Sequence, residues 1–184
     1  AVFPFLMQTA NYQGLKVTAD YHSKIDDFLV VEAPLQININ TKPYTVVMRT
    51  PKDDFELIRG LLFAEDIYKN DKELAYQIIK KEVNIPSIIN VTISNINLGK
   101  GYLNKRTLLS VSSCGICGKK ELKDIKVDGN TIQENTEISL DYLHEMHRIM
   151  NDLQKTFQKT GGSHAAAIFN KNKDILTIKE DIGR

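Results

Sequence analysis

Cys114 and Cys117 are the only cysteines of this 184-residue chain, and only two residues separate them. A disulfide across so short a loop restricts the unfolded chain very little, so stabilisation of the fold explains the pair poorly. Gly115 and Gly118 leave room for a bulky reactant, and the positive charge of Lys119 favours the thiolate. The thiolate is the form that attacks sulfur, so this spacing indicates a chemical role.

A Cys-x-x-Cys pair has three ordinary uses: dithiol redox chemistry, half of a zinc site, and sulfur handling by a nucleophilic cysteine. Structural zinc takes four protein ligands, so a zinc site would also need histidines or a second subunit. His144 and His147 lie three residues apart, but such neighbours on a helix are more often the flank of an amphipathic face. The residues alone leave the three uses open, and we expect no permanently bound metal.

A second group of candidate residues lies toward the C-terminus. His164 closely follows two glycines and precedes three alanines, so its ring emerges among small neighbours. A histidine packed against the backbone explains this position equally well. Glu180, Asp181 and Arg184 form an acidic turn with a basic partner, which is either a functional cluster or a surface ion pair worth about 0–1 kcal/mol.

The composition limits the classes of protein to consider. With 42% apolar and 26% charged residues, the chain is able to form one or two modest cores. The net charge of +1 comes from 24 basic and 23 acidic residues, so the basic surface typical of nucleic-acid binding is not expected. No stretch approaches the roughly 20 apolar residues of a membrane span, and residues 1–7 do not resemble a secretory signal. We therefore expect a cytoplasmic protein, in a compartment where thiols stay reduced.

The first third of the chain alternates predicted strands with one helix. Strands are expected at 28–32, 35–40 and 44–48, and the last two are joined by a turn. Thr50 as the N-cap and Pro51 at the first helical position predict a helix that ends at about Ala64.

The remaining elements place the candidate residues at loops and strand ends. They are a helix over 71–81, a strand over 90–98, a strand over 106–112 that leads into the cysteine loop, a hairpin of 125–127 and 131–132, a helix from a Ser139 cap to about Thr160, and paired strands at 164–169 and 175–179. The long helix has an apolar stripe, which is predicted to be core. Its residues are Leu140, Leu143, Met146, Met150, Leu153 and Phe157.

Several short segments follow one another in an order characteristic of one protein family. They are VEAPL at 31–35 with Asn40, MRTP at 48–51, GLLFAE at 60–65, SSCGICGK at 112–119, TGGSHAA at 160–166 and EDIGR at 180–184. In this order they resemble the FdhD family, the accessory sulfurtransferases of formate dehydrogenase. The resemblance runs from about residue 28 to the end of the sequence and is weakest between residues 66 and 105.

The resemblance implies a sulfur relay. FdhD-like proteins accept a persulfide sulfur from a cysteine desulfurase and pass it to the molybdenum or tungsten bis(molybdopterin guanine dinucleotide) cofactor before it enters formate dehydrogenase. By this resemblance Cys114 is the persulfide carrier and Cys117 assists it. The implied partners are the desulfurase, formate dehydrogenase, the guanine-nucleotide-containing pterin cofactor and a second copy in a homodimer, with no nucleic acid and no membrane.

The resemblance also implies an α/β (α+β) fold in two parts. A β-rich N-terminal subdomain over residues 1–135 would carry the Cys-x-x-Cys loop, and residues 136–184 would begin a cytidine-deaminase-like α/β subdomain. Ala166 stands where deaminases have the catalytic glutamate, so deamination is not expected. The residues expected at the cofactor site are Gly161, Gly162, His164, Glu180, Asp181 and Arg184. A strand that runs at once into the turn at 180–184 normally leads to another element, so we expect a natural C-terminal portion to be absent from this sequence.

Two rival functions come from other classes. A thiol–disulfide oxidoreductase would cycle between dithiol and disulfide, but the residues after Cys117 are a weak helix start for a thioredoxin-type site. A non-catalytic carrier or chaperone would shield the molybdenum cofactor without using its cysteines.

Overall fold

The computed structural model of the chain describes residues 8–82, 85–103 and 137–183. These residues form a mixed α/β fold, which confirms the predicted fold class. In chain order the elements are β1 (Thr9–Val17), β2 (His22–Val30), β3 (Ala33–Ile39), β4 (Lys42–Arg49), α1 (Asp54–Ala64), β5 (Ala75–Glu82), β6 (Ile85–Thr92), a 3-10 turn (Asn95–Asn97), α2 (Lys100–Leu103), α3 (Leu140–Leu153), α4 (Lys155–Thr160), β7 (His164–Phe169) and β8 (Ile175–Asp181). The predicted strands at 106–112, 125–127 and 131–132 lie outside the described residues.

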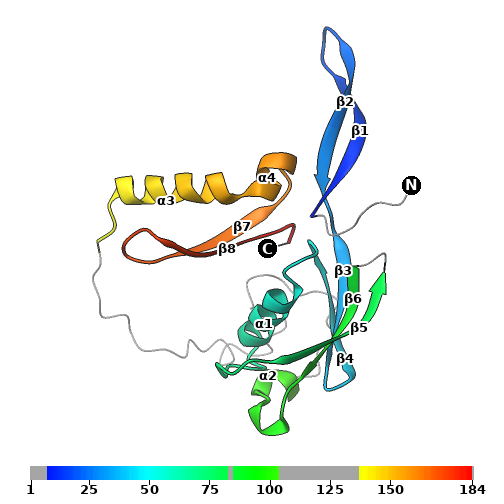
Figure 1. The fold of residues 1–184 in the computed structure, drawn as a ribbon, viewed down its shortest axis with the longest axis vertical. Coiled ribbons are helices and arrows are strands. Elements are labelled where there is room, and N and C mark those ends of the chain that lie inside the picture. The colour runs from blue at the N-terminus through cyan, green and yellow to red at the C-terminus, as the bar shows by residue number, and fades with distance from the viewer. Residues whose placement is uncertain (1–7, 83–84, 104–136, 184) are drawn as a thin grey trace, which may run out of the picture.

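The described residues build three separate sheets (Figure 1). β1 and β2 form a long antiparallel hairpin, and the next four strands form a sheet in the order β4-β3-β6-β5. Within that sheet β3 and β6 are parallel, whereas the other neighbours are antiparallel. The C-terminal part consists of the β7–β8 hairpin with α3 and α4 lying along one side of it (Figure 1).

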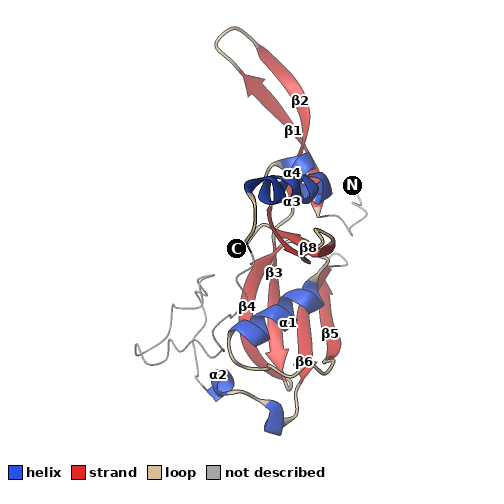
Figure 2. Cartoon of the chain, turned by 90° about the vertical axis from the view of Figure 1, so that its left-hand side faces the viewer, coloured by secondary structure: helices blue, strands red, loops and turns tan. Residues whose placement is uncertain are grey.

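The core lies between the four-stranded sheet and α1, which covers one face of that sheet (Figure 2). Alternate residues of β3 point to this face, and Leu35, Ile37 and Ile39 are fully buried. Ile58 and Leu62 meet them from one face of α1, because residues four apart share a helical face. Full burial of such a side chain contributes about 1.5–3 kcal/mol, so this cluster is the main apolar source of stability.

Several predicted elements are confirmed. The strands expected at 35–40 and 44–48 are β3 and β4, and those expected at 164–169 and 175–179 are β7 and β8. α1 ends at Ala64, as its apolar spacing predicts.

The predicted helix over 71–81 is wrong, because residues 75–82 form β5 at the edge of the four-stranded sheet. Tyr76, Ile78 and Ile79 are residue types that favour strands. Antiparallel pairing of β5 with β6 therefore outweighs a weak helical pattern.

The predicted strand over 90–98 begins too late and ends too late. β6 starts at Ile85 and includes Pro86, which the sequence suggests as a break. The parallel pairing of β6 with β3 begins only at Ile88, opposite Gln36, so the missing N–H of Pro86 costs that ladder no hydrogen bond. Residues 95–97 form a 3-10 turn instead of strand.

The predicted helix from Ser139 to Thr160 is two helices. Ser139 caps α3 as expected, since its Oγ accepts a hydrogen bond from the Tyr142 N–H at 3.1 Å. The helix breaks at Gln154, whose ψ of 70° is not helical. Helix α4 then restarts because a carboxylate from β8 accepts hydrogen bonds from its first N–H groups.

The prediction that the apolar stripe of this segment is core is wrong. Leu140, Leu143, Leu153 and Phe157 are exposed, and α3 has no buried residue. Met146 and Met150 of the stripe are only half-buried. The helix contacts the β7–β8 turn through Tyr142, whose hydroxyl donates to the Asn170 carbonyl at 2.8 Å.

The β1–β2 hairpin is the largest element that the sequence patterns miss, since they predict only a strand at 28–32. Most side chains of both strands are exposed, so the alternation that marks a half-buried strand is weak. β2 ends at Val30, and the next N–H, from Val31, donates to the Gln8 carbonyl at the base of the hairpin.

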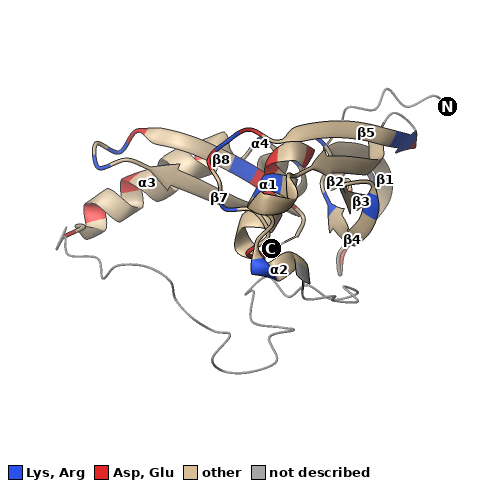
Figure 3. Ribbon diagram, turned by 90° about the horizontal axis from the view of Figure 1, so that it is seen from below, with Lys and Arg blue, Asp and Glu red and all other residues tan. Residues whose placement is uncertain are grey.

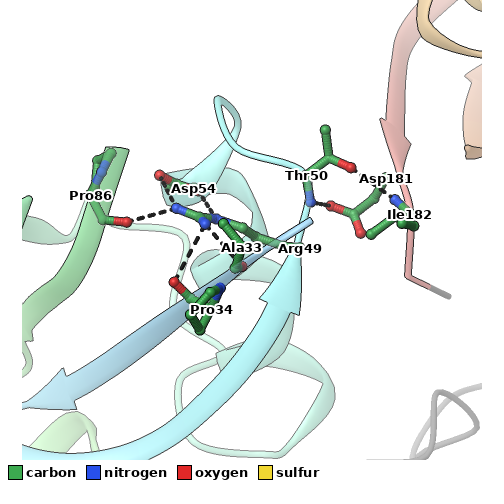
Figure 4. A network of polar contacts seen from close by, with 8 residues as sticks. All are labelled: Ala33, Pro34, Arg49, Thr50, Asp54, Pro86, Asp181 and Ile182. Carbon is green, nitrogen blue, oxygen red and sulfur yellow. Dashed lines mark hydrogen bonds and ion pairs between the residues drawn. The ribbon is translucent and has the colours of Figure 1, made fainter. Parts of the chain in front are cut away.

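Acidic and basic residues are interspersed over the elements of both parts (Figure 3). Arg49 is nevertheless a fully buried charged residue. Arg49, at the end of β4, is 0% exposed, and its guanidinium pairs with Asp54 in the first turn of α1 (Figure 4).

All five N–H donors of Arg49 have acceptors. Nε and one terminal nitrogen donate to the two carboxylate oxygens of Asp54, at 2.8 and 3.2 Å. The other bonds go to backbone carbonyls of Ala33 at 3.0 Å, Pro34 at 3.5 Å and Pro86 at 2.8 Å. The guanidinium therefore joins β4 to the starts of β3, β6 and α1 (Figure 4).

We expect Asp54→Asn to destabilise the protein by about 3–5 kcal/mol, because it leaves the buried Arg49 charge without its counterion. The free energy of unfolding in urea measures this loss. Glu82→Gln is the matched control, since Glu82 pairs with Lys80 on the surface and an exposed pair is worth about 0–1 kcal/mol. Equal losses in the two variants would contradict the assignment of Arg49 as the central structural contact.

Candidate functional site

The predicted site residues fall into two groups. Cys114, Cys117 and Arg184 lie outside the described residues. The others, Gly161, Gly162, His164, Glu180 and Asp181, lie at the α4–β7 turn and at the end of β8.

Pairing of β7 with β8 brings the second group together. His164 is directly opposite Asp181 in the register, and Ala165 is opposite Glu180. The antiparallel hairpin thus places the histidine at the start of one strand beside the acidic end of the other. The His164 side chain is exposed there, whereas both acidic residues are partly buried.

The two glycines serve the turn that leads into β7. Gly161 has a φ of 62°, in the left-handed region that favours glycine, and its N–H donates to the Phe157 carbonyl to end α4. A Cβ on Gly162 would stand 3.0 Å from the Val30 side chain, so a larger residue would push against the hairpin base. Both glycines are thereby explained by backbone geometry, and a role in cofactor binding stays a prediction.

Glu180 is the acceptor that starts α4. Its carboxylate accepts from the N–H groups of Thr156 at 2.9 Å and Phe157 at 2.8 Å, and from the Ser163 hydroxyl at 3.0 Å. A negative charge at these N–H groups is favourable, because they have no acceptor within the helix. Glu180 therefore ties β8 to both ends of the α4 segment.

Asp181 joins the two parts of the protein. Its carboxylate accepts from the backbone N–H of Thr50 at 2.9 Å, and the Thr50 hydroxyl accepts from the Ile182 N–H at 3.1 Å (Figure 4). The second Asp181 oxygen accepts from the Gly183 N–H at 2.6 Å. Thr50 is thus a connection to β8 and not the predicted helix cap, and α1 begins only at Asp54 with Asp53 at its N-cap.

An ion pair reinforces the same connection. The Lys179 ammonium on β8 lies 2.6 Å from Asp53 and 3.0 Å from Glu56, at the start of α1. The hydrogen bonds to Asp53 and then to Glu56 raise the pKa of Lys179. A raised pKa means that this contribution to stability is complete below the unfolded pKa near 10.5 and is lost as the pH rises through the folded value.

The ends of the cysteine-bearing segment are held by the described structure. Before it, the Gly99 N–H donates to the Ile67 carbonyl at 2.7 Å and the Gly101 N–H to the Asp66 carbonyl at 3.0 Å. A Cβ on either glycine would overlap a backbone carbonyl of the loop after α1, so only glycine permits this approach. After it, the chain re-enters the described structure at the capped start of α3.

The paired-histidine alternative gains no support from this geometry. The imidazole of His147 contacts the Asn151 side chain at 3.3 Å, one turn further along α3. Within the described ranges, no three or more histidine, cysteine or acidic side chains gather closely enough to hold a metal ion. Nor does any helix in these ranges combine the length and apolar character needed to cross a membrane.

The sequence patterns miss Arg49 as the centre of the polar network. The available signal is its position: Thr45, Val47 and Arg49 alternate along β4 on the side that faces the core. A charged residue at such an inward position needs a buried partner. Asp54, five residues later, is the first residue of α1 and supplies that partner.

Together these observations define an α/β protein in which several sequence motifs meet around Arg49 and Thr50. The profile of the FdhD/NarQ family matches residues 30–184. The chain belongs to this family, and the predicted resemblance is confirmed.

Curated relatives of the chain carry the name sulfur carrier protein FdhD. The protein from Mycobacterium tuberculosis is 33% identical over 186 residues, which cover 96% of this chain and 67% of that protein. The protein from Sulfolobus acidocaldarius is 32% identical and is matched over 97% of this chain and 66% of its own length. The chain therefore spans about two thirds of the length of these relatives.

A solved structure shows the same fold. It is described as a formate dehydrogenase accessory protein from Desulfotalea psychrophila, and it superimposes with a TM-score of 0.64. The superposition covers 97% of this chain and 64% of that one, at 16% sequence identity.

We expect Glu180→Ala to destabilise the protein by about 1–3 kcal/mol, because three donors lose their acceptor. Hydrogen exchange should also speed up at the Thr156 and Phe157 amides. Glu145→Ala is the control, since Glu145 forms an exposed surface pair with Lys173. Unchanged exchange in α4 would show that Glu180 does not hold this helix.

Proposed function

We propose that the chain acts as a sulfur carrier for the activation of formate dehydrogenase. In this proposal Cys114 accepts a sulfur from the persulfide of a cysteine desulfurase. It then passes this sulfur to the molybdenum or tungsten bis(molybdopterin guanine dinucleotide) cofactor, which is the acceptor substrate. The observation that carries the proposal is the family match over residues 30–184, because this range includes both cysteines of the chain.

The first step is a thiolate attack on the outer sulfur of the donor persulfide. A new S–S bond forms at Cys114 Sγ, the S–S bond of the donor breaks, and the donor cysteine leaves as a thiolate. No external oxidant or reductant is needed, since the sulfane sulfur moves with its oxidation level unchanged. Gly115 and Lys119 support this step by leaving space for the donor and by favouring the thiolate.

Cys117 has an auxiliary role in this proposal. Its thiolate would attack Sγ of the Cys114 persulfide, form a Cys114–Cys117 disulfide and release the sulfur as sulfide. A dithiol reductant would then return the pair to thiols.

The acceptor site in this proposal lies at the end of the β7–β8 hairpin. His164 is exposed there, and in this proposal its ring contacts the incoming cofactor. Glu180 and Asp181 act through the backbone, because their carboxylate oxygens already accept hydrogen bonds from other parts of the chain. Gly161 and Gly162 shape the turn that presents the histidine, and Arg184 would supply a positive charge for the cofactor phosphates.

The setting of the proposal is a reducing cytoplasm, where a free thiolate pair persists. The partners are the desulfurase as donor, formate dehydrogenase as the recipient of the activated cofactor, and a second copy of this chain in a homodimer.

We expect Cys114→Ala to abolish sulfur transfer while the thermal transition of the protein stays unchanged. After incubation with a cysteine desulfurase and cysteine, mass spectrometry should find one added sulfur on Cys114 of the wild type and none on the variant. Cys117→Ala is the matched control and should still accept one sulfur. Full activation of formate dehydrogenase by Cys114→Ala would refute the carrier role.

The same experiment separates the rival functions. A thiol–disulfide oxidoreductase would lose activity equally in both single variants and would accumulate no persulfide. A shielding carrier would still activate formate dehydrogenase when both cysteines are replaced by alanine.

A further inference from the structure

The β1–β2 hairpin projects from the body of the protein as a two-stranded arm (Figures 1 and 2). Among the described residues, only those at its base meet another element, α4. There the Thr156 hydroxyl on α4 donates to the Gln8 side chain at 3.2 Å, and the Lys159 ammonium lies 4.8 Å from the centre of the Phe28 ring. The family profile begins at residue 30, so most of the arm lies outside the part of the chain that the profile describes.

An isolated two-stranded hairpin is marginally stable in water, and no other described element forms a layer over either face of this one. Large apolar side chains are nevertheless exposed along it on both faces. They are Tyr12, Leu15, Val17, Tyr21 and Leu29. Such a concentration on one projecting element is the mark of an interaction surface.

The outer edge of β2 is open to a further strand. β2 pairs with β1 on one side, and no other described strand pairs with it. Near the base, the Phe28 N–H donates to the side chain of the adjacent Asp27 at 2.8 Å. An unpaired edge of this length is a template for pairing with another chain.

The charges along β2 indicate that the chain pairing with this edge is a second copy of the same chain. Ile25 lies between a basic and an acidic residue, since Lys24 precedes it and Asp26 follows it. When two copies of β2 align antiparallel about Ile25, Lys24 of each lies opposite Asp26 of the other. The pattern is self-complementary, as the two-fold interface of identical subunits requires.

We propose that the arm pairs with the arm of a second copy of this chain, edge to edge along β2, with the two Ile25 residues facing each other at the two-fold axis. Pairing joins the two hairpins into a four-stranded ribbon and covers part of the exposed apolar surface. The side chains remain available for this, since Lys24 and Asp26 are exposed and Asp26 uses one oxygen to accept from Gln13. This inference gives a surface to the homodimer of the proposed function, and its test measures association without any sulfur transfer.

Charge reversal on β2 tests the pairing. Sedimentation equilibrium should find a dimer for the wild-type protein. Lys24→Asp and Asp26→Lys should each raise the dimer dissociation constant about tenfold or more, because like charges then face each other twice. The double variant Lys24→Asp/Asp26→Lys should restore the wild-type constant. Lys16→Asp is the matched control, since it makes the same charge change on β1, away from the paired edge.

A cross-link provides a second measurement that does not depend on the folding of the charge variants. With Cys114 and Cys117 both replaced by alanine, Ile25→Cys should oxidise to a disulfide-linked dimer, because facing residues of antiparallel strands approach within disulfide reach. Tyr12→Cys on β1 should not cross-link under the same conditions. A wild-type protein that stays monomeric, or a dimer that resists charge reversal and cross-links equally at both positions, would overturn the proposal.

Discussion

A buried guanidinium organises this protein. Arg49 is removed from water at the meeting point of β3, β4, β6 and α1, and burial of a charge is costly unless every donor is satisfied. The carboxylate of Asp54 and the carbonyls of Ala33, Pro34 and Pro86 meet this requirement. The strand starts and the helix start are therefore fixed relative to one another by one side chain.

The residue after Arg49 extends this order to the C-terminal part. Thr50 exchanges hydrogen bonds with Asp181 and Ile182, so the position of β8 follows from that of β4. Glu180, next to Asp181, in turn holds α4, and α4 packs against the base of the β1–β2 hairpin. The positions of β8, α4 and the base of the β1–β2 hairpin thus depend on a series of contacts that begins at the buried ion pair of Arg49 and Asp54.

This arrangement suits a protein that hands a reactive atom from one partner to another. The acidic motif residues Glu180 and Asp181 accept hydrogen bonds from other parts of the chain. Contacts of Gly99, Gly101 and Ser139 anchor the ends of the cysteine-bearing segment. Reactive residues are commonly carried by loops held between rigid elements. Anchored ends of the cysteine-bearing segment are compatible with the sulfur relay that we propose.

The sequence by itself determined the family and the strands β3, β4, β7 and β8, and it predicted the cysteine pair as the reactive element, because short motifs and alternating patterns are local properties. Tertiary structure alone decided that residues 75–82 are a strand, that the helix after Ser139 breaks at Gln154, and that Thr50, Glu180 and Asp181 hold the two parts together. The contacts of Thr50, Glu180 and Asp181 join residues more than 20 positions apart, such as the 131 residues between Thr50 and Asp181, and no local pattern reports such partners. The strand at 75–82 depends on its pairing with β6, which a pattern within the segment itself does not report either. The apolar stripe of α3 shows the same limit, since amphipathic spacing predicts a face but not whether another part of the protein covers it.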